Sequence, residues 1–320
     1  MLTSADEIRS ILACPRCHAG IHWSEREGRC VNAVCGLHAP DSFPIIGDQP
    51  VLVDFDESVL VRSHVLDSDA SSVIPRTARF AKIRQLIGEL RNPVAERFAK
   101  DMVDRLDTGA HVLVIGGGTI GTGAQALYES DKLRVIGTDI YASPYTRAVV
   151  DAHQLPFGDG EIDGVWIQAV LEHVLDPWRV VAEIHRVLKP GGLVFADTPF
   201  MQQVHEGAYD FTRFTVSGHR WLFRRFRCIN AGATRGAGTT LAWSLRYFFR
   251  AVSGSDLFAR LAAVLFGWLR VFDGKSQGHQ DGASGVYFFG AASSESIRPA
   301  DIIRFYDECK GAALTLNNAN

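Results

Sequence analysis

Residues 151–200 read DAHQLPFGDGEIDGVWIQAVLEHVLDPWRVVAEIHRVLKPGGLVFADTPF, and this stretch decides the fold. Its apolar run over residues 164–170 predicts a buried strand. Asp176 and Pro177 then suit the N-cap and the first position of a helix, and apolar residues follow at helical spacing. The sequence Lys-Pro-Gly-Gly ends that helix, and a second strand is expected from Leu193. The stretch therefore predicts a strand, a helix and a strand of an open α/β sheet.

Further strands are expected on both sides of this unit. An apolar strand over residues 111–115 leads into a turn of three glycines, where a backbone can approach a ligand closely. A second strand over residues 133–140 carries Asp139 about twenty residues beyond the glycines, where nucleotide-binding sheets place an acid that holds a ribose. A short third strand ends at Asp151. The last two strands are expected over residues 227–231 and 285–291.

The sequence of residues 151–200 resembles the second half of class I S-adenosylmethionine (SAM) dependent methyltransferases of the UbiE-like group. In that family an Asp followed by LPF, a buried strand, an LEHV-like turn and a helix ending in LKPGG occur in this order, as they do here. The resemblance implies a seven-stranded, mostly parallel, Rossmann-like α/β sheet over residues 109–295, with a helical insertion before the last strand. It also implies SAM as the cofactor, held by Gly116, Gly117, Gly118, Asp139, Asp151, Ala152 and Gln168.

Two positions depart from the family pattern. Val114 stands where these enzymes usually keep an acidic residue, and Ile120 interrupts the usual glycine spacing. The amino end of SAM would then be held differently, by backbone groups. The missing acid is also consistent with a subunit that binds SAM but has lost catalysis.

Candidate catalytic residues lie in the LEHV turn and after the fifth strand. A base is needed only if the acceptor carries a proton at neutral pH. His173 is one candidate, although a histidine in this turn can also simply support the SAM pocket. His205, Tyr209 and Asp210 belong to the segment HEGAYDFTRFT, which lies where the resemblance implies the acceptor site. The same polar and aromatic residues would equally suit a loop that packs on the core.

Four cysteines crowd into a short N-terminal segment and predict a structural Zn²⁺ site. A CPxC turn supplies two thiolates, and a second pair completes a tetrahedral set. The predicted ligands are Cys14, Cys17, Cys30 and Cys35, with His18 and His38 as possible substitutes for one thiolate. The segment resembles the small zinc-ribbon proteins that partner methyltransferases, in which CPxC is likewise followed by a PIxxGxPxLV ending, here residues 44–53.

Residues 213–275 are strongly basic, with ten Arg and one Lys against only two Asp. Two apolar stretches, 241–252 and 257–272, carry arginines along them. One interpretation is a helical cover over residues 236–275 with a solvated basic rim. The other is a surface for an anionic partner: membrane lipid, a lipid-linked phosphate or RNA.

The bulk composition is that of an ordinary globular protein, with 47% hydrophobic residues, 22% charged residues and a net charge of −3. We expect a zinc-ribbon-like domain over 1–53, a helical linker and pre-core helix over 54–108, and a C-terminal helix and tail over 296–320. The N-terminus does not read as a signal peptide, and no apolar run is long enough to span a bilayer. The clustered cysteines suit a reducing compartment, so a cytoplasmic protein is expected, with peripheral contact at the inner membrane face as an option.

The leading hypothesis is a SAM-dependent methyltransferase that acts on a small or lipid-linked acceptor, at oxygen or carbon. A second is an rRNA or tRNA methyltransferase whose zinc ribbon grips RNA. The turn QAVLEH over 168–173 argues against it, because it lacks the Asn/Asp-Pro-Pro-aromatic signature of nucleobase amino-methylation. A third is a catalytically inactive SAM-binding scaffold.

Overall fold

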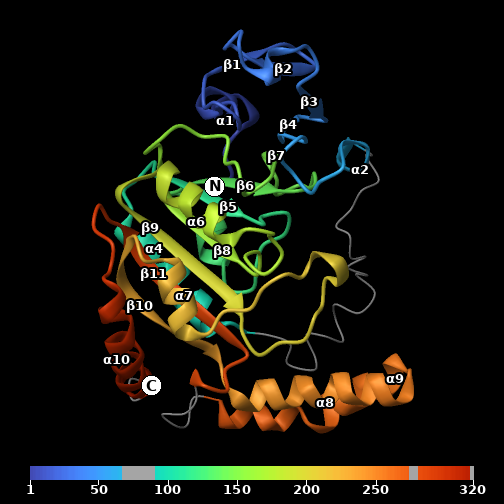
Figure 1. Cartoon of the computed structure of the whole chain (residues 1–320), viewed down its shortest axis with the longest axis vertical. Coiled ribbons are helices and arrows are strands. Elements are labelled where there is room, and N and C mark those ends of the chain that lie inside the picture. The colour runs from blue at the N-terminus through green and yellow to red at the C-terminus, as the bar shows by residue number, and fades with distance from the viewer. Residues whose placement is uncertain (67–90, 274–279, 318–320) are drawn as a thin grey trace.

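The computed structural model describes residues 1–66, 91–273 and 280–317, and for 309–317 the backbone only. The described strands form a single mixed sheet with helices on both faces (Figure 1). Its strand order is β1-β2-β3-β4-β7-β6-β5-β8-β9-β11-β10. Part of the linker predicted over 54–108 lies outside the described residues.

The central strands confirm the predicted α/β architecture. Five of them run parallel: β7 (Ala148–Val150), β6 (Arg134–Asp139), β5 (His111–Ile115), β8 (Ile162–Gln168) and β9 (Leu188–Pro199). Strand β11 (Gly285–Ala292) is antiparallel to its two neighbours, β9 and β10 (Phe226–Arg235). These seven strands occupy the region in which the resemblance implies the sheet.

The sheet does not end with those seven strands. The N-terminal ribbon, residues 1–53, contains helix α1 (Ala5–Ile11) and four short strands: β1 (Ile21–Trp23), β2 (Glu27–Cys30), β3 (Phe43–Ile46) and β4 (Gln49–Leu52). Strand β4 pairs in parallel with β7, with Val51 opposite Val149 and Leu52 opposite Val150. Both Val51 and Leu52 are fully buried, as in a strand covered on both faces. The sheet therefore has eleven described strands instead of the expected seven.

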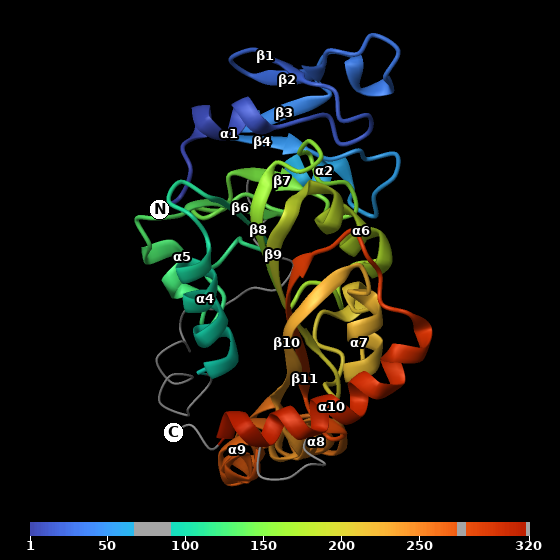
Figure 2. The same cartoon turned by 90° about the vertical axis from the view of Figure 1, so that its left-hand side faces the viewer.

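Helices cover the two faces of the central strands (Figure 2). Helix α4 (Pro93–Arg105) and helix α5 (Gln125–Glu129) lie on one face. Helices α6 (Pro177–Val187), α7 (Val216–Leu222) and α10 (Pro299–Asn317) lie on the other. Asp176 caps α6 as predicted, because its side chain accepts a hydrogen bond from the backbone N–H of Arg179 at 3.1 Å.

The strand after α6 begins earlier than the sequence predicts. We expected it from Leu193, but β9 begins at Leu188, directly after the helix. Leu188 pairs with Ile162, and a register shift in the ladder then takes up the intervening residues. Gly191 adopts a φ of 78°, which glycine tolerates best.

A helical hairpin lies between β10 and β11, where the insertion was expected. It consists of α8 (Ala237–Ser253), α9 (Asp256–Leu265) and the short helix η4 (Gly267–Phe272). Figures 1 and 2 place this hairpin and the N-terminal ribbon at opposite ends of the long axis of the molecule. Within the described parts of the chain, no helix combines the length and apolarity needed to cross a bilayer.

Candidate functional site

A cavity of about 1030 Å³ opens at the carboxyl ends of the parallel strands. It lies where the strand order changes direction between β5 and β8, the place at which open α/β sheets bind ligands. Its volume is at the upper end of what ligand pockets usually offer, roughly 300–1,000 Å³. It therefore has room for more than one small molecule.

The glycine turn after β5 forms one wall. Gly116 has a φ of 74° and lines the cavity. A Cβ at this position would stand 2.3 Å from a methyl carbon of Val170, so a larger residue would not fit without movement. The backbone N–H of Gly118 donates to Asp139 Oδ2 at 2.7 Å, which ties the turn to the end of β6. Neither Gly118 nor Gly117 lines the cavity.

The predicted acids have different surroundings. Asp139 lines the cavity and also accepts from the backbone N–H of Ile140 at 2.8 Å. Asp151 is almost fully buried and accepts hydrogen bonds from the Ser58 hydroxyl and from the backbone N–H of His153, at 2.9 Å for the latter. Burial raises the pKa of Asp151, but its contacts with His153 and Ser58 outweigh that effect and hold the pKa below its usual value. The Asp151 carboxylate therefore links the segment that contains Ser58 to the turn that contains His153.

The remaining predicted cofactor residues also border the cavity. Ala152 and Gln168 line it, and the amide of Gln168 donates to the backbone carbonyl of Thr122 at 3.1 Å. Val114 lies within an apolar cluster and is 4% exposed, so the side chain that replaces the family's acid faces the core.

Sequence reasoning missed Asp197, an acid at the end of β9 that also lines the cavity. It accepts from Thr234 Oγ1 at 2.6 Å and from the Asn92 side-chain amide at 2.8 Å. Burial raises its pKa. The position of Asp197 at the carboxyl end of a predicted parallel strand could have indicated that it lines the cavity.

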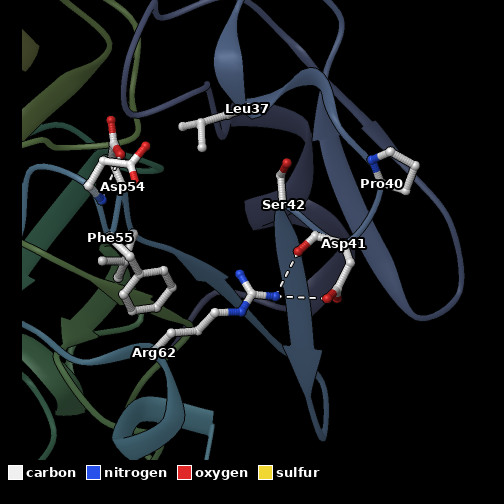
Figure 3. A pocket seen from close by; sticks show the side chains of 9 residues that line it. Leu37, Pro40, Asp41, Ser42, Asp54, Phe55 and Arg62 are labelled. Carbon is white, nitrogen blue, oxygen red and sulfur yellow. Dashed lines mark hydrogen bonds and ion pairs between the residues drawn. The ribbon is translucent and has the colours of Figure 1, made fainter.

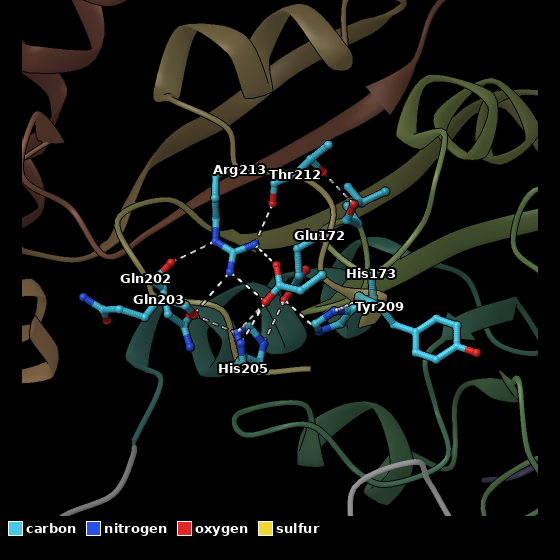
Figure 4. Close-up of polar contacts among 10 residues, drawn as sticks. Glu172, His173, Gln202, Gln203, His205, Tyr209, Thr212 and Arg213 are labelled. Carbon is cyan, nitrogen blue, oxygen red and sulfur yellow. Dashed lines mark hydrogen bonds and ion pairs between the residues drawn. The ribbon is translucent and has the colours of Figure 1, made fainter. Parts of the chain in front are cut away.

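Where the acceptor site is expected, Glu172, His173 and His205 form a compact group that we call the Glu-His-His cluster (Figure 4). Glu172 Oε1 lies 3.5 Å from His173 Nε2 and 3.8 Å from His205 Nε2. The Glu172 side chain is fully buried, and neither carboxyl oxygen has a hydrogen-bond partner among the described residues. Burial raises the pKa of Glu172 to about 8.

The segment HEGAYDFTRFT, residues 205–215, which we call the acceptor segment for its predicted role, is fixed to the turn that carries Glu172. The backbone carbonyl of Glu172 accepts from the backbone N–H of Phe211 at 2.8 Å. Asp210 is paired with the Arg213 guanidinium and accepts from the backbone N–H of His205 at 2.9 Å. Burial alone would raise the pKa of Asp210, but Arg213 and the His205 N–H lower it to about 2. These contacts hold the segment against the turn.

The structure brings His173 and His205 together but separates the ring of Tyr209 from them. Figure 4 shows that ring directed away from Glu172. Only the backbone of Tyr209 joins the group, because its carbonyl oxygen lies 2.7 Å from His173 Nδ1. Sequence reasoning missed Glu172 and Arg213 as site residues. Glu172 was visible as the acid of the LEHV turn.

Helix α8 closes the far end of the cavity. Trp243, Arg246, Tyr247 and Arg250 line it, and their spacing places them on one stripe of the helix. The other sides of the hairpin expose large apolar residues. These are Leu241, Phe248, Val252, Leu257, Phe258, Leu261, Val264, Leu265, Trp268, Val271 and Phe272.

The four N-terminal cysteines converge as a ligand set. All four sulfur atoms lie within 4.8 Å of one another. Cys14 and Cys35 are 3.9 Å apart, and Cys17 and Cys30 are 3.4 Å apart. Tetrahedral Zn²⁺ with Zn–S bonds of about 2.3 Å needs sulfurs about 3.8 Å apart, so the thiols fit that ion. His38 is engaged elsewhere, with Nδ1 at 2.7 Å from the Cys30 carbonyl.

A second hollow of about 370 Å³ lies beside the ribbon (Figure 3). Arg62 enters it and donates to the backbone carbonyl and to Oδ2 of Asp41, both at 2.8 Å. Because these polar groups satisfy each other, the larger cavity is the better candidate site.

Part of the central sheet matches a known protein family. Residues 113–196 match the family model described as Methyltransferase domain. That match includes the glycine turn, Asp139, Asp151 and the LEHV turn, and ends before Asp197 and the acceptor segment.

Similar curated proteins share only part of their length with this chain. The O-methyltransferase cnsE of Penicillium expansum is 32% identical over 127 residues, which cover 34% of this chain and 46% of that protein. The C-methyltransferase UbiE of Acidiphilium cryptum is 32% identical over 142 residues, 38% of this chain and 52% of that protein. An uncharacterised 37.1 kDa protein in transposon TN4556 of Streptomyces fradiae is 35% identical over 123 residues, 33% of this chain and 35% of that protein. The chain thus spans about half or less of these relatives.

Among solved structures, similarity is found to a putative sarcosine dimethylglycine methyltransferase from Galdieria sulphuraria. The TM-score is 0.43 at 15% identity, covering 63% of this chain and 86% of that one. A complex of the Haloferax volcanii Trm112 methyltransferase activator with a putative methyltransferase gives a TM-score of 0.41 at 20% identity, covering 62% of this chain and 90% of that one.

Proposed function

We propose that the protein is a SAM-dependent methyltransferase that acts on a small or lipid-linked acceptor, at oxygen or carbon. One observation carries the proposal: a single cavity joins the strand-end residues of the methyltransferase-like segment to the Glu-His-His cluster, whose carboxyl group is buried. SAM would lie along the ends of β5, β6 and β8, with Asp139 beside its ribose. The acceptor would lie between the sulfonium and the acceptor segment.

Methyl transfer from SAM requires few catalytic groups from the protein. The methyl group of a sulfonium is already activated, so alignment of the acceptor with it supplies much of the rate. An acceptor hydroxyl must also lose its proton as the new bond forms. The Glu-His-His cluster places polar groups where the acceptor would lie.

The helical hairpin supports a lipid-linked acceptor. One stripe of α8 lines the cavity with two arginines and two aromatic residues, while the exposed sides of the hairpin are apolar. Arginines suit a phosphate, and the apolar surface suits the boundary of a lipid layer. A single element would then both contact the layer and receive the head group.

The N-terminal cysteines would hold a structural Zn²⁺. Four thiolates leave no open coordination position, so this ion would stabilise the ribbon without entering the reaction. An RNA methyltransferase has no comparable support, because the hairpin and its arginines lie at the opposite end of the molecule from the ribbon.

Calorimetry with SAM tests the cofactor site. We expect binding by the full chain, and an affinity about 10- to 100-fold lower for Asp139→Ala, because a hydrogen bond to a charged group contributes about 1.5–3 kcal/mol. Asp104→Ala, an exposed acid on α4, is the matched control and should bind as the unaltered protein does. Equal SAM affinity of the Asp139 and Asp104 variants would refute the assignment of Asp139 to the SAM site. Failure of the unaltered chain to bind SAM would refute the proposed activity.

Transfer of a labelled methyl group identifies the acceptor class. The full chain is incubated with methyl-labelled SAM and cell extract, which is then divided into a solvent-extractable fraction and RNA. We expect the label in the solvent-extractable fraction. Label in RNA would instead establish the second hypothesis.

A further inference from the structure

The Glu-His-His cluster brings three potential ligand atoms together, Glu172 Oε1 and the Nε2 atoms of His173 and His205. The Tyr209 carbonyl can only accept, so the nearby His173 Nδ1 carries the ring proton. His205 Nδ1 likewise faces two acceptors, the Gln203 carbonyl and Asp210 Oδ2, both at 3.3 Å. In the neutral rings, both Nε2 atoms therefore present lone pairs to Glu172 Oε1.

The buried carboxyl group of Glu172 is energetically unfavourable in this arrangement. The separations of 3.5 and 3.8 Å are too long for good hydrogen bonds, even from a protonated Glu172. A fully buried carboxyl group that has no hydrogen-bond partner among the described residues loses its hydration without a compensating hydrogen bond. A cation between the three atoms would satisfy all of them at once.

The surroundings also favour a cation. Asp210 lies beside His205, and the positive charge of Arg213 is already paired with that carboxylate. Both histidines have the support that metal ligands usually have, an Nδ1–H held by a carbonyl or carboxylate acceptor.

We propose that Glu172, His173 and His205 bind a first-row divalent transition metal ion. Two imidazoles and one carboxylate form a donor set suited to such ions and not to Mg²⁺ or Ca²⁺, which prefer oxygen ligands. Bonds of about 2.0–2.2 Å would bring Glu172 Oε1 to about 3 Å from each Nε2, less than 1 Å closer than the present 3.5 and 3.8 Å. All three residues border the cavity, so the open coordination positions face it.

Those open positions would take an oxygen donor of the acceptor, a hydroxyl or a phosphate. This last step rests on the proposed function, whereas metal binding does not. The two histidines would then be ligands that position the acceptor, and not bases.

Titration with Co²⁺ tests the site in the absence of SAM. The full chain is used with zinc retained on its cysteines, and binding is followed by calorimetry and visible absorption. We expect one Co²⁺ per chain without the intense charge-transfer bands of thiolate ligation. Glu172→Gln and His205→Gln should each lower the Co²⁺ affinity by about 100-fold or more, because they remove a ligand. His64→Gln, an exposed histidine that lines the same cavity, should leave it unchanged.

Absence of stoichiometric Co²⁺ binding by the unaltered chain would overturn the proposal, as would equal affinity in the Glu172 and His64 variants. Circular dichroism checks that each variant folds, and Glu172→Asp, which keeps a carboxylate, should retain partial affinity. Because SAM is absent, failure here is distinct from failure of the proposed methyl transfer, which the SAM calorimetry reports.

Discussion

Single residues decide which chemistry each side of the cavity can support. Glu172 gives the acceptor side a carboxyl group that no described residue satisfies. Gly116 gives the SAM side a wall that no side chain could replace, because its φ is 74° and a Cβ would meet Val170 at 2.3 Å. The Glu172 carboxyl group lacks a hydrogen-bond partner, whereas Gly116 is needed because it has no side chain.

Gly116→Ala should therefore impair both stability and SAM binding. A left-handed backbone costs a residue with a Cβ about 1–2 kcal/mol, and the contact with Val170 adds to it. Gly160→Ala is the matched control, because its φ is 67° and its Cβ would meet nothing within 4 Å. We expect the Gly116 variant to lose more unfolding free energy in urea than the control. Adding Val170→Ala should restore part of the difference, and equal losses in the two single variants would contradict the steric argument.

Short elements at the N-terminus depend on contacts that are distant in sequence. The CPxC turn is anchored through Arg16, which pairs with the buried Asp54 at 2.5 Å and with Asp56 at 2.8 Å. Strands of three or four residues are marginal alone. A bound metal would hold their thiol ligands together, so the ribbon and its pairing with β7 should depend on it.

Metal removal tests this dependence. A mercurial reagent should release about one Zn²⁺ per chain, and Cys14→Ser with Cys17→Ser should abolish that release. Cys228→Ser, which lies in β10 away from the cluster, should not change it. In the double variant we expect faster amide exchange in β1–β4 than in β8 and β9. Full zinc release from the double variant would disprove the ligand assignment.

Local elements were predictable from sequence, whereas their long-range pairing was not. Helix α6 followed from Asp176, Pro177 and the apolar spacing, because caps and periodicity act within a few residues. The pairing of β4 with β7 joins segments almost a hundred residues apart, and the sequence carries no local signal for its register. The Glu-His-His cluster likewise needs the turn after β8 and the acceptor segment to meet. Asp139 and Gln168 could be placed at the cavity because strand ends share one edge of the sheet.

At the scale of the whole molecule, two different modules lie at the ends of one axis (Figure 2). The ribbon is at one end and the apolar helical hairpin at the other, with the cavity extending to α8. If the hairpin meets a lipid layer, the ribbon points away from it. The cavity would then receive its acceptor from the layer side.

Vesicle sedimentation tests that orientation. We expect the full chain to bind vesicles that contain anionic phospholipid, and to bind less at high salt because the arginines are screened. Phe258→Asp with Leu265→Asp, 54% and 66% exposed on α9, should weaken binding by at least about 10-fold, since burying each apolar side chain fully is worth about 1.5–3 kcal/mol. Val34→Asp, 92% exposed on the ribbon, is the control. If the α9 double variant and Val34→Asp bind vesicles equally well, the hairpin is not the surface that contacts the lipid.

The pairing of β4 with β7 has a consequence for the integrity of the protein. Strand β7 is only three residues long and entirely apolar, and β4 covers its outer side. Without the ribbon, β7 would become an exposed sheet edge whose free N–H and C=O groups could recruit a strand from another chain. During synthesis β4 emerges first and must wait for β7 before its own hydrogen bonds are complete. The ribbon would therefore protect this edge of the central sheet from pairing with another chain.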